Sequence, residues 1–387
     1  MNIKELDSKY IAGTYSRFDV TFTHGHGSTL YDENEKEYID LGGGIAVTTF
    51  GISDDVWKND VISQLEKLQH VSNLYYTQPQ VKLAELLCQK TGMKKVFFSN
   101  SGAEANECAI KAARKYSNDK YGKGRSTIIT LKNSFHGRTI TTLSATGQDV
   151  FHKDFGPFTE GFIYAEPNNI SDMERLISEN SCCAIMIELI QGEGGVYVLD
   201  KEYVSQLANI ATEKDLLLIV DEVQTGNGRT GELYCYMNYN ITPDIVSTAK
   251  GLAGGLPMGA TLLGEKLKDT LGPSSHGSTF GGNPVCAAGA ISVLTRIDDP
   301  LLAGVREKSK YIFDELEGTP GIKSISGLGL MIGIETEKPA KDVVTACIKK
   351  GVVTLTAKDK VRLLPALNIP FEQLKKAIQI LKEEISA

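Results

Sequence analysis

The residue types that could do chemistry in this sequence gather where buried strands are expected to end. Asp221 and Glu222 follow the apolar run 216–220, and Lys250 follows the next expected strand, 244–248. Polar groups at the carboxyl ends of strands in an open α/β sheet line the ligand crevice. A carboxylate buried there needs a partner, because burying it alone is costly. The pattern predicts a ligand site with an acid and an amine.

Lys250 is followed by four glycines, Gly251, Gly254, Gly255 and Gly259. An ammonium at the end of an apolar strand, surrounded by glycine turns, is a candidate Schiff-base lysine. The alternative is a lysine that only caps a strand in solvent, and the spacing by itself favours that alternative.

A third strand end is suited to an anion. Ser101, Gly102, Ala103 and Glu104 connect the expected strand 95–100 to an expected helix. Ser101 and Glu104 have the spacing of a capping box, and a helix N-terminus attracts anions. An ordinary capped helix is the alternative. Taken together, a phosphate seat, a buried acid and a lone lysine are the parts that pyridoxal 5'-phosphate requires.

A literal G-x-G-x-x-G occurs at residues 226–231, after a strand. A dinucleotide fingerprint needs a helix that starts within the motif and an acid at the end of the following strand. The residues after 231 make a poor helix, and Asp244 precedes its strand. The sequence therefore argues against a nicotinamide or flavin site, and a dehydrogenase or a non-catalytic binding protein is a weak alternative.

The composition is that of a globular protein of 387 residues, which predicts two or three domains. Lys plus Arg is 41 and Asp plus Glu is 48, so the net charge of −7 argues against nucleic-acid binding. No apolar run approaches the ~18 residues of a membrane helix, and the N-terminus lacks a signal-peptide pattern. Seven cysteines without a C-x-x-C pair predict reduced thiols in the cytoplasm and no metal site.

The elements that must position these residues alternate between strands and helices. Expected strands are 95–100, 127–131, 161–164, 184–189, 216–220, 244–248 and 260–263, with helices expected at 104–116, 172–179 and 201–214. Several strands are continuously apolar, which is typical of strands covered on both faces. The fold class is therefore α/β, with a mostly parallel sheet of about seven strands.

The two ends of the chain have a different pattern. Residues 18–41 predict a short antiparallel hairpin with a turn at 32–35. Helices are expected at 284–297, 301–317 and 370–385, with short strands at 322–326, 330–335, 351–355 and 361–364. We expect an N-terminal segment (1–50) that packs with a smaller C-terminal α+β domain (286–387), and a large cofactor-binding domain (51–285).

The sequence resembles a known family over nearly its whole length. The motifs lie at residues 72–76, 98–107, 134–139, 191–195, 221–231, 249–260 and 277–284. They resemble those of the class III, fold-type I, pyridoxal-phosphate-dependent aminotransferases, and among these the acetylornithine aminotransferases. The resemblance implies a cytoplasmic homodimer with active sites at the subunit interface, with no nucleic-acid or membrane partner.

The resemblance also implies the residues that hold the cofactor. Lys250 would carry it as a Schiff base, and Asp221 would pair with the ring nitrogen. Phe135 and Val223 would cover the two ring faces, and Gln224 would reach the phenolic oxygen.

For the phosphate, the resemblance implies the backbone of Gly102 and Ala103, near Ser101. Thr279 would reach the phosphate of the neighbouring subunit.

For the substrates, the resemblance implies two carboxylate binders, Arg138 and Arg362. Glu188 would be an acidic gate able to pair with Arg362. Tyr15 and Asn73 are further candidates for the substrate channel.

The implied reaction moves the terminal amino group of N2-acetyl-L-ornithine to 2-oxoglutarate, a step of arginine biosynthesis. Ornithine, succinylornithine, succinyl-diaminopimelate and 4-aminobutyrate remain alternative donors. The sequence departs from the family pattern at Ile52, Leu189 and Ala366. None of the three is a catalytic position, but together they leave the shape of the substrate channel open.

Overall fold

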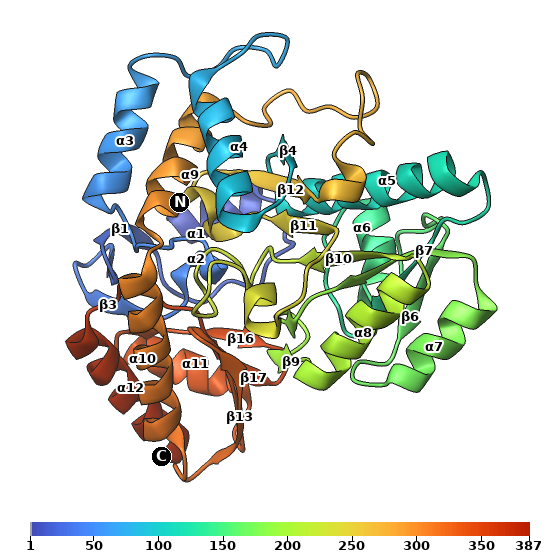
Figure 1. Ribbon diagram of the computed structural model, residues 1–387. Helices are drawn as coiled ribbons and strands as arrows, with labels where there is room; N and C mark the ends of the chain where they lie inside the picture. The colour runs from blue at the N-terminus through green and yellow to red at the C-terminus, as the bar shows by residue number, and fades with distance from the viewer. Residues whose placement is uncertain (1) are drawn as a thin grey trace.

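A seven-stranded sheet forms the centre of the protein, seen here in a computed structural model that describes residues 2–387 (Figure 1). The strand order is β4-β12-β11-β10-β7-β5-β6. The strands are β4 (Lys95–Ser99), β5 (Thr127–Leu131), β6 (Phe162–Ala165), β7 (Cys182–Ile187), β10 (Leu217–Asp221), β11 (Ile245–Thr248) and β12 (Gly259–Leu263). Only β12 pairs antiparallel with its neighbours in this sheet. The expected α/β fold is confirmed.

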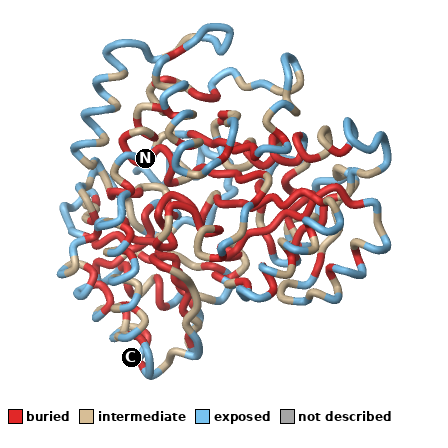
Figure 2. Tube along the Cα trace, viewed as in Figure 1, coloured by how far each residue is buried: buried red, intermediate tan, exposed pale blue. Residues whose placement is uncertain are grey.

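Helices cover both faces of the sheet. The helices of this part are α3 (Asp55–Leu65), α4 (Gln78–Thr91), α5 (Gly102–Tyr121), α6 (Ile140–Ala145), α7 (Ile170–Glu179), α8 (Lys201–Glu213) and α9 (Pro284–Arg296). Leu217 and Ile219 of β10 pack in a core cluster with α5, whereas Leu218 and Val220 pack in another with α7 and α8. Because the inner strands β7, β10, β11 and β12 are buried on both sides, the centre of the sheet is a buried layer in Figure 2.

The N-terminal segment and the C-terminal part share a second core, at the lower left of Figure 1. The elements of these two parts of the chain are α1 (Ile3–Tyr10), β1 (Phe22–His26), β2 (Thr29–Asp32), β3 (Glu37–Asp40), α2 (Gly43–Ala46), α10 (Asp299–Leu316), β13 (Ile322–Leu328), β14 (Met331–Thr336), α11 (Ala340–Lys349), β15 (Val352–Val353), β16 (Leu355–Ala357), β17 (Lys360–Leu363) and α12 (Phe371–Ser386). Parallel pairing of β15 with β3 joins the two ends of the chain.

Two features differ in detail from the sequence prediction, and a third, the absence of a helix starting within residues 226–231, agrees with it. Strands β1 to β3 form a three-stranded meander instead of a hairpin, since Thr29–Asp32 is a strand of its own. The expected strand 351–355 is divided into β15 and β16, which belong to different sheets. Residues 226–231 form successive turns that lead to the 3₁₀ helix η2 (Cys235–Tyr239).

The two cores divide the chain near α9 and α10. Ala287, Ala290 and Val293 of α9 belong to the core of the large sheet, whereas Val305 and Ile312 of α10 belong to the second core. The proposed domain boundary at residue 285 stays a prediction, and this packing favours a position closer to 298. Within the described part of the chain, no helix has the length and apolarity to span a membrane.

Candidate active site

A cavity of about 520 Å³ lies at the carboxyl edge of the parallel strands. It is lined by nearly all of the residues expected to bind the cofactor and by two of the expected substrate binders, although they come from distant parts of the sequence. They are Ser101, Gly102, Ala103, Phe135, Arg138, Glu188, Asp221, Val223, Gln224 and Lys250, with Tyr15, Asn106, His136 and Gly137 beside them. Asp221 is the last residue of β10, and Glu188 directly follows β7. The parallel topology thus brings these side chains to one edge.

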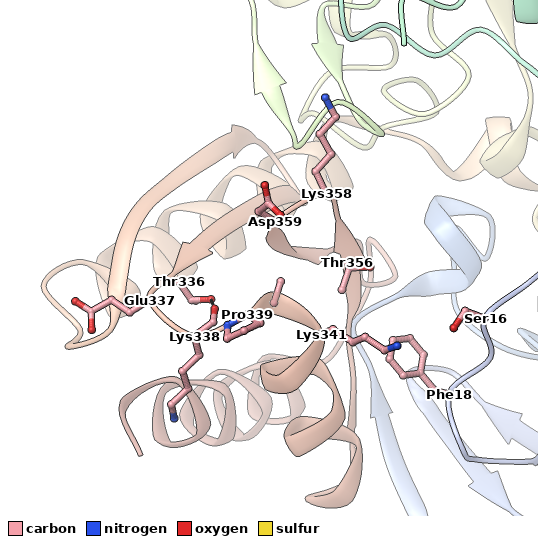
Figure 3. Close-up of a pocket in the computed structure, with 11 residues that line it drawn as sticks. Ser16, Phe18, Thr336, Glu337, Lys338, Pro339, Lys341, Thr356, Lys358 and Asp359 are labelled. Atoms are coloured by element: carbon pink, nitrogen blue, oxygen red, sulfur yellow. Dashed lines mark hydrogen bonds between the residues drawn. The ribbon is translucent and has the colours of Figure 1, made fainter. Parts of the chain in front are cut away.

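A larger cavity, about 610 Å³, lies beside the second core and is shown in Figure 3. Lys338 and Lys358 on its wall point away from each other (Figure 3). Lys338 donates to the carbonyl of Glu384 and Lys358 to the side chain of Asn133. The smaller cavity is the candidate active site, because it is the one that brings Lys250, Asp221 and the N-terminus of α5 together.

Asp221 is held in place by three donors. Its Oδ2 accepts from Asn106 Nδ2 at 2.7 Å and lies 2.8 Å from His136 Nδ1, and its Oδ1 accepts from the backbone N–H of Val223 at 3.0 Å. The side chain is 4% exposed. A buried carboxylate with this many donors keeps a fixed orientation toward the cavity. The sequence prediction included Asp221 but missed Asn106 and His136.

His136 contacts Asp221 through one of its two ring nitrogens, Nδ1. Its Nε2 atom is buried without a hydrogen-bond partner among the described residues. The hydrogen bond of the buried ring is therefore made through Nδ1, which orients the imidazole against the Asp221 carboxylate.

Lys250 has an unusual backbone. Its φ of +44° lies in the left-handed region, where a residue with a side chain is strained. It opens the 3₁₀ helix η3 (Lys250–Ala253), directly after Ala249, and its Nζ atom has no hydrogen-bond partner among the described residues. Burial lowers the pKa of the Lys250 ammonium, and the attraction of Glu193 opposes that shift only in part. A larger fraction of the amine is therefore unprotonated at a given pH.

The N-terminus of α5 forms the anion-binding end of the cavity. Ser101 Oγ accepts from the N–H of Glu104 at 3.2 Å, and the Glu104 carboxylate accepts from the N–H of Asn100 at 2.8 Å. The N–H groups of Gly102 and Ala103 have no partner within the helix, because they belong to its first turn. A Cβ atom at Gly102 would lie 2.6 Å from Cγ1 of Val223, so only glycine fits there.

Arg362 and Glu193 form a buried pair beside the cavity. Arg362 lies in β17 and is 2% exposed. Its Nη1 donates to Glu193 Oε1 at 2.6 Å and to Gln224 Oε1 at 3.0 Å. Burial acts to raise the pKa of Glu193, but the charge and hydrogen bond of Arg362 outweigh it and hold that pKa below its ordinary value. Glu193 lies within the motif 191–195, yet the sequence analysis gave it no role.

Glu188 was expected to pair with Arg362 and has a different partner here. Its Oε2 accepts from the backbone N–H of Phe135 at 2.8 Å. Burial, and then the nearby charge of Asp221, raise the pKa of Glu188 well above its ordinary value. Glu193 holds the position beside Arg362 that the prediction gave to Glu188. Whether Glu188 binds substrate stays a prediction.

The remaining predicted residues lie around the cavity or outside it. Arg138 is exposed, with its guanidinium 5.4 Å from the Phe135 ring centre and 4.0 Å from that of Phe151. Thr279 is exposed and does not line the cavity of its own chain. Asn73 donates to the carbonyls of Ser278 and Gly281, and so ties the loop before α4 to the loop that carries Thr279.

Comparison with known proteins decides the family. The family model for class-III aminotransferases matches residues 10–385. The chain belongs to the class-III aminotransferases. It is 51% identical to an acetylornithine aminotransferase of Haemophilus ducreyi, across 99% of this chain and 98% of that protein. It is 41% identical to a succinylornithine transaminase of Photorhabdus laumondii, across 97% and 96%. An ornithine aminotransferase structure from Toxoplasma gondii, described with partial occupancy of PLP at its active site, has a TM-score of 0.94 at 30% identity and covers 99% and 93% of the two chains.

The cavity of this class-III aminotransferase fits pyridoxal phosphate. The cofactor needs a free amine, an acid for its ring nitrogen and a cradle for its phosphate. Lys250 Nζ has no hydrogen-bond partner among the described residues, Asp221 is fixed by its hydrogen bonds, and the N–H groups at the start of α5 are open to the cavity. Phe135 and Val223 line the same cavity and supply apolar surfaces for a flat ring.

Proposed function

We propose that this enzyme transfers the terminal amino group of N2-acetyl-L-ornithine to 2-oxoglutarate, giving N-acetyl-L-glutamate 5-semialdehyde and L-glutamate. The observation that carries the reaction type is the convergence of Lys250, Asp221 and the N-terminus of α5 on one cavity. The identity of 51% to an acetylornithine aminotransferase supports the donor. The proposal places the enzyme in arginine biosynthesis and in the cytoplasm.

Pyridoxal phosphate would be held at both of its ends. Lys250 would bond to its aldehyde, Asp221 would face its ring nitrogen, and Gly102 and Ala103 would donate backbone N–H groups to its phosphate. When bound, the cofactor supplies an electron sink that stabilises negative charge at the reacting carbon of the amine. Asp221 favours the protonated ring nitrogen, because a nearby negative charge stabilises a cation.

Lys250 would also move the proton. Once the substrate amine occupies the cofactor, Nζ of Lys250 is free to take a proton from the carbon that bears that amine. The lowered pKa of Lys250 serves this step, since only the unprotonated amine is a base. Lys250 lines the cavity, so its amine is available to a substrate bound there.

Two arginines would let one cavity accept two unlike substrates. Arg138 has no carboxylate partner among the described residues and is free to bind the carboxylate of N-acetylornithine or the distal carboxylate of glutamate. Arg362 would bind the α-carboxylate of glutamate, and it must first leave Glu193. With the ω-amine donor, Glu193 keeps the buried guanidinium paired, which avoids an uncompensated charge.

A panel of amino donors with 2-oxoglutarate tests this proposal. We expect the highest kcat/KM for N-acetylornithine, with product aldehyde and glutamate formed in equal amounts. Succinylornithine is the second candidate, because a relative 41% identical bears that name. A clear preference for ornithine or 4-aminobutyrate would contradict the proposed donor while leaving the aminotransferase chemistry intact.

A further inference from the structure

Arg229 is a buried arginine that the reaction above does not use. It lies in the glycine-rich loop 226–231, with a side chain 2% exposed and without an ion pair among the described residues. Burial lowers the pKa of Arg229 to about 10, and the attraction of Asp40 opposes that shift only in part. Burying a guanidinium without a direct ion pair is costly, so its hydrogen bonds must offset part of that cost.

Those contacts join the loop to the C-terminal part of the chain. Arg229 Nη1 donates to the carbonyl of Leu330 at 3.1 Å and to that of Pro365 at 2.5 Å. In return, the N–H of Leu330 donates to the backbone carbonyl of Arg229 at 2.9 Å. The approach is so close that a Cβ atom at Gly329 would lie 2.4 Å from that carbonyl oxygen. The side chain and the backbone of Arg229 thus both hydrogen-bond to the backbone of Leu330.

The two carbonyls flank the strand pair that carries Arg362. Leu330 directly precedes β14, and Pro365 follows β17 by two residues. In the antiparallel pairing of these strands, Gly333 is the partner of Arg362. Arg229 therefore binds the start of β14 and the residues after β17, close to the position of Arg362 in the strand pair.

The other end of the same segment contacts the Arg362 side chain. Gln224 accepts from Arg362 Nη1, and Asp221 begins the segment within the cofactor site. One stretch of eleven residues, 221–231, consequently contains Asp221, contacts Arg362 through Gln224 and contacts the ends of β14 and β17 through Arg229.

We propose that Arg229 is a positioning residue that sets the place of Arg362 relative to Asp221, and so determines how well an α-carboxylate is accepted. The inference rests on the proposed function, in which Arg362 binds glutamate and not N-acetylornithine. A displacement of about 1 Å at a substrate-positioning group costs up to ~100-fold in rate. Loss of Arg229 should therefore lower the rate with glutamate more than the rate with N-acetylornithine.

Arg229→Lys tests this inference, because lysine keeps the charge but cannot span two carbonyls in fixed geometry. We expect kcat/KM for glutamate to fall by about 10-fold or more, mainly through KM, with a change of less than about 2-fold for N-acetylornithine. The matched control is Arg306→Gln. Arg306 also donates to this loop, at Gly231, but from α10, and among the described residues it makes no hydrogen bond to the strand pair.

Equal losses for both substrates in Arg229→Lys would overturn the inference, and so would the same split in Arg306→Gln. A second readout does not require turnover. Glutarate, a dicarboxylate that cannot react, should raise the melting temperature of the wild-type holoenzyme and of Arg306→Gln more than that of Arg229→Lys. Wild-type protein that does not bind glutarate would overturn both the role of Arg362 and the inference.

If Arg229→Lys does not fold, Asp40→Asn tests the role of Arg229 instead. Asparagine keeps the Oδ1 acceptor that binds the N–H groups of Gly42 and Gly43, and removes only the charge that acts on Arg229. We expect weaker glutarate binding, by about 3-fold, and unchanged binding would overturn the inference. A wild-type enzyme that binds glutarate but does not use N-acetylornithine would contradict the proposed donor alone.

Discussion

Lys250 combines two properties that seldom occur together on a surface lysine. Its pKa is lowered by burial, and its backbone adopts a conformation that costs about 1–3 kcal/mol. Strain of this size persists where the surrounding structure fixes the residue, as the contact of Gly251 with Thr49 does here. These properties distinguish the reactive lysine from the strand-capping lysine that spacing alone favoured.

Lys250→Ala should therefore abolish turnover and the covalent attachment of pyridoxal phosphate. After reduction with borohydride, peptide mapping by mass spectrometry should find the adduct on Lys250 in the wild type and no adduct in the variant. Lys308→Ala is the control, because Lys308 also has a pKa lowered by burial but lies in α10, away from the cavity. An adduct on another lysine of the wild type would contradict the assignment.

Glu193→Gln should change the balance between the two half-reactions. A neutral glutamine holds Arg362 less firmly, so the α-carboxylate of glutamate competes for it more easily. The single-turnover rate with glutamate should rise relative to that with N-acetylornithine by about 10-fold. Glu188→Gln is the comparison, since Glu188 binds the backbone of Phe135 and should leave the ratio within about 2-fold. A large change of this ratio in Glu188→Gln, with little change in Glu193→Gln, would show that Glu188 is the residue that pairs with Arg362 during the reaction.

At the level of elements, the start of α5 couples the phosphate seat to the segment after β10. Gly102→Ala would place a methyl group 2.6 Å from Val223 Cγ1, so one of the two must move. Overpacking of this kind costs about 1–3 kcal/mol, and we expect it as a 10-fold or greater loss of affinity for pyridoxal phosphate. Fluorescence titration of the apoenzyme measures this affinity.

The matched control for Gly102→Ala is Gly272→Ala, in an exposed loop where an added Cβ atom meets nothing within 4 Å. This variant should bind the cofactor as the wild type does. Normal cofactor affinity in Gly102→Ala would contradict the phosphate seat at α5.

The sheet was predictable from the sequence because its strands are buried on both faces and read as continuous apolar runs. The site residues at its edge followed, since Asp221, Lys250 and Ser101 stand at strand ends. The pair of Arg362 and Glu193 was not predictable, because it joins residues far apart in the chain through side-chain rotamers that no local pattern encodes. The division of 351–355 into two strands likewise depends on partners, β3 and β17, that lie elsewhere in the sequence.

At the scale of the whole molecule, one apolar surface lies outside both cores. Leu74, Tyr75, Tyr76 and Phe280 are 87%, 65%, 99% and 58% exposed. They lie on two loops that Asn73 ties together, and Thr279 is next to Phe280. Contiguous exposed apolar residues mark interaction sites in soluble proteins. A second copy of the chain is the occupant we propose, which would bring Thr279 to the partner's cavity.

Tyr76→Asp tests this assembly, because Tyr76 is almost fully exposed and its loss should leave the isolated protomer folded. A charge buried in a subunit interface without a partner is strongly unfavourable, so the variant should sediment as a monomer at concentrations where the wild type is a dimer. Activity and affinity for pyridoxal phosphate should fall with it, since the monomer lacks the partner's threonine. Tyr121→Asp, at the far end of α5, is the control and should remain an active dimer. Full activity in a monomeric Tyr76→Asp would show that each chain completes its own phosphate seat, and that Thr279 has no part in it.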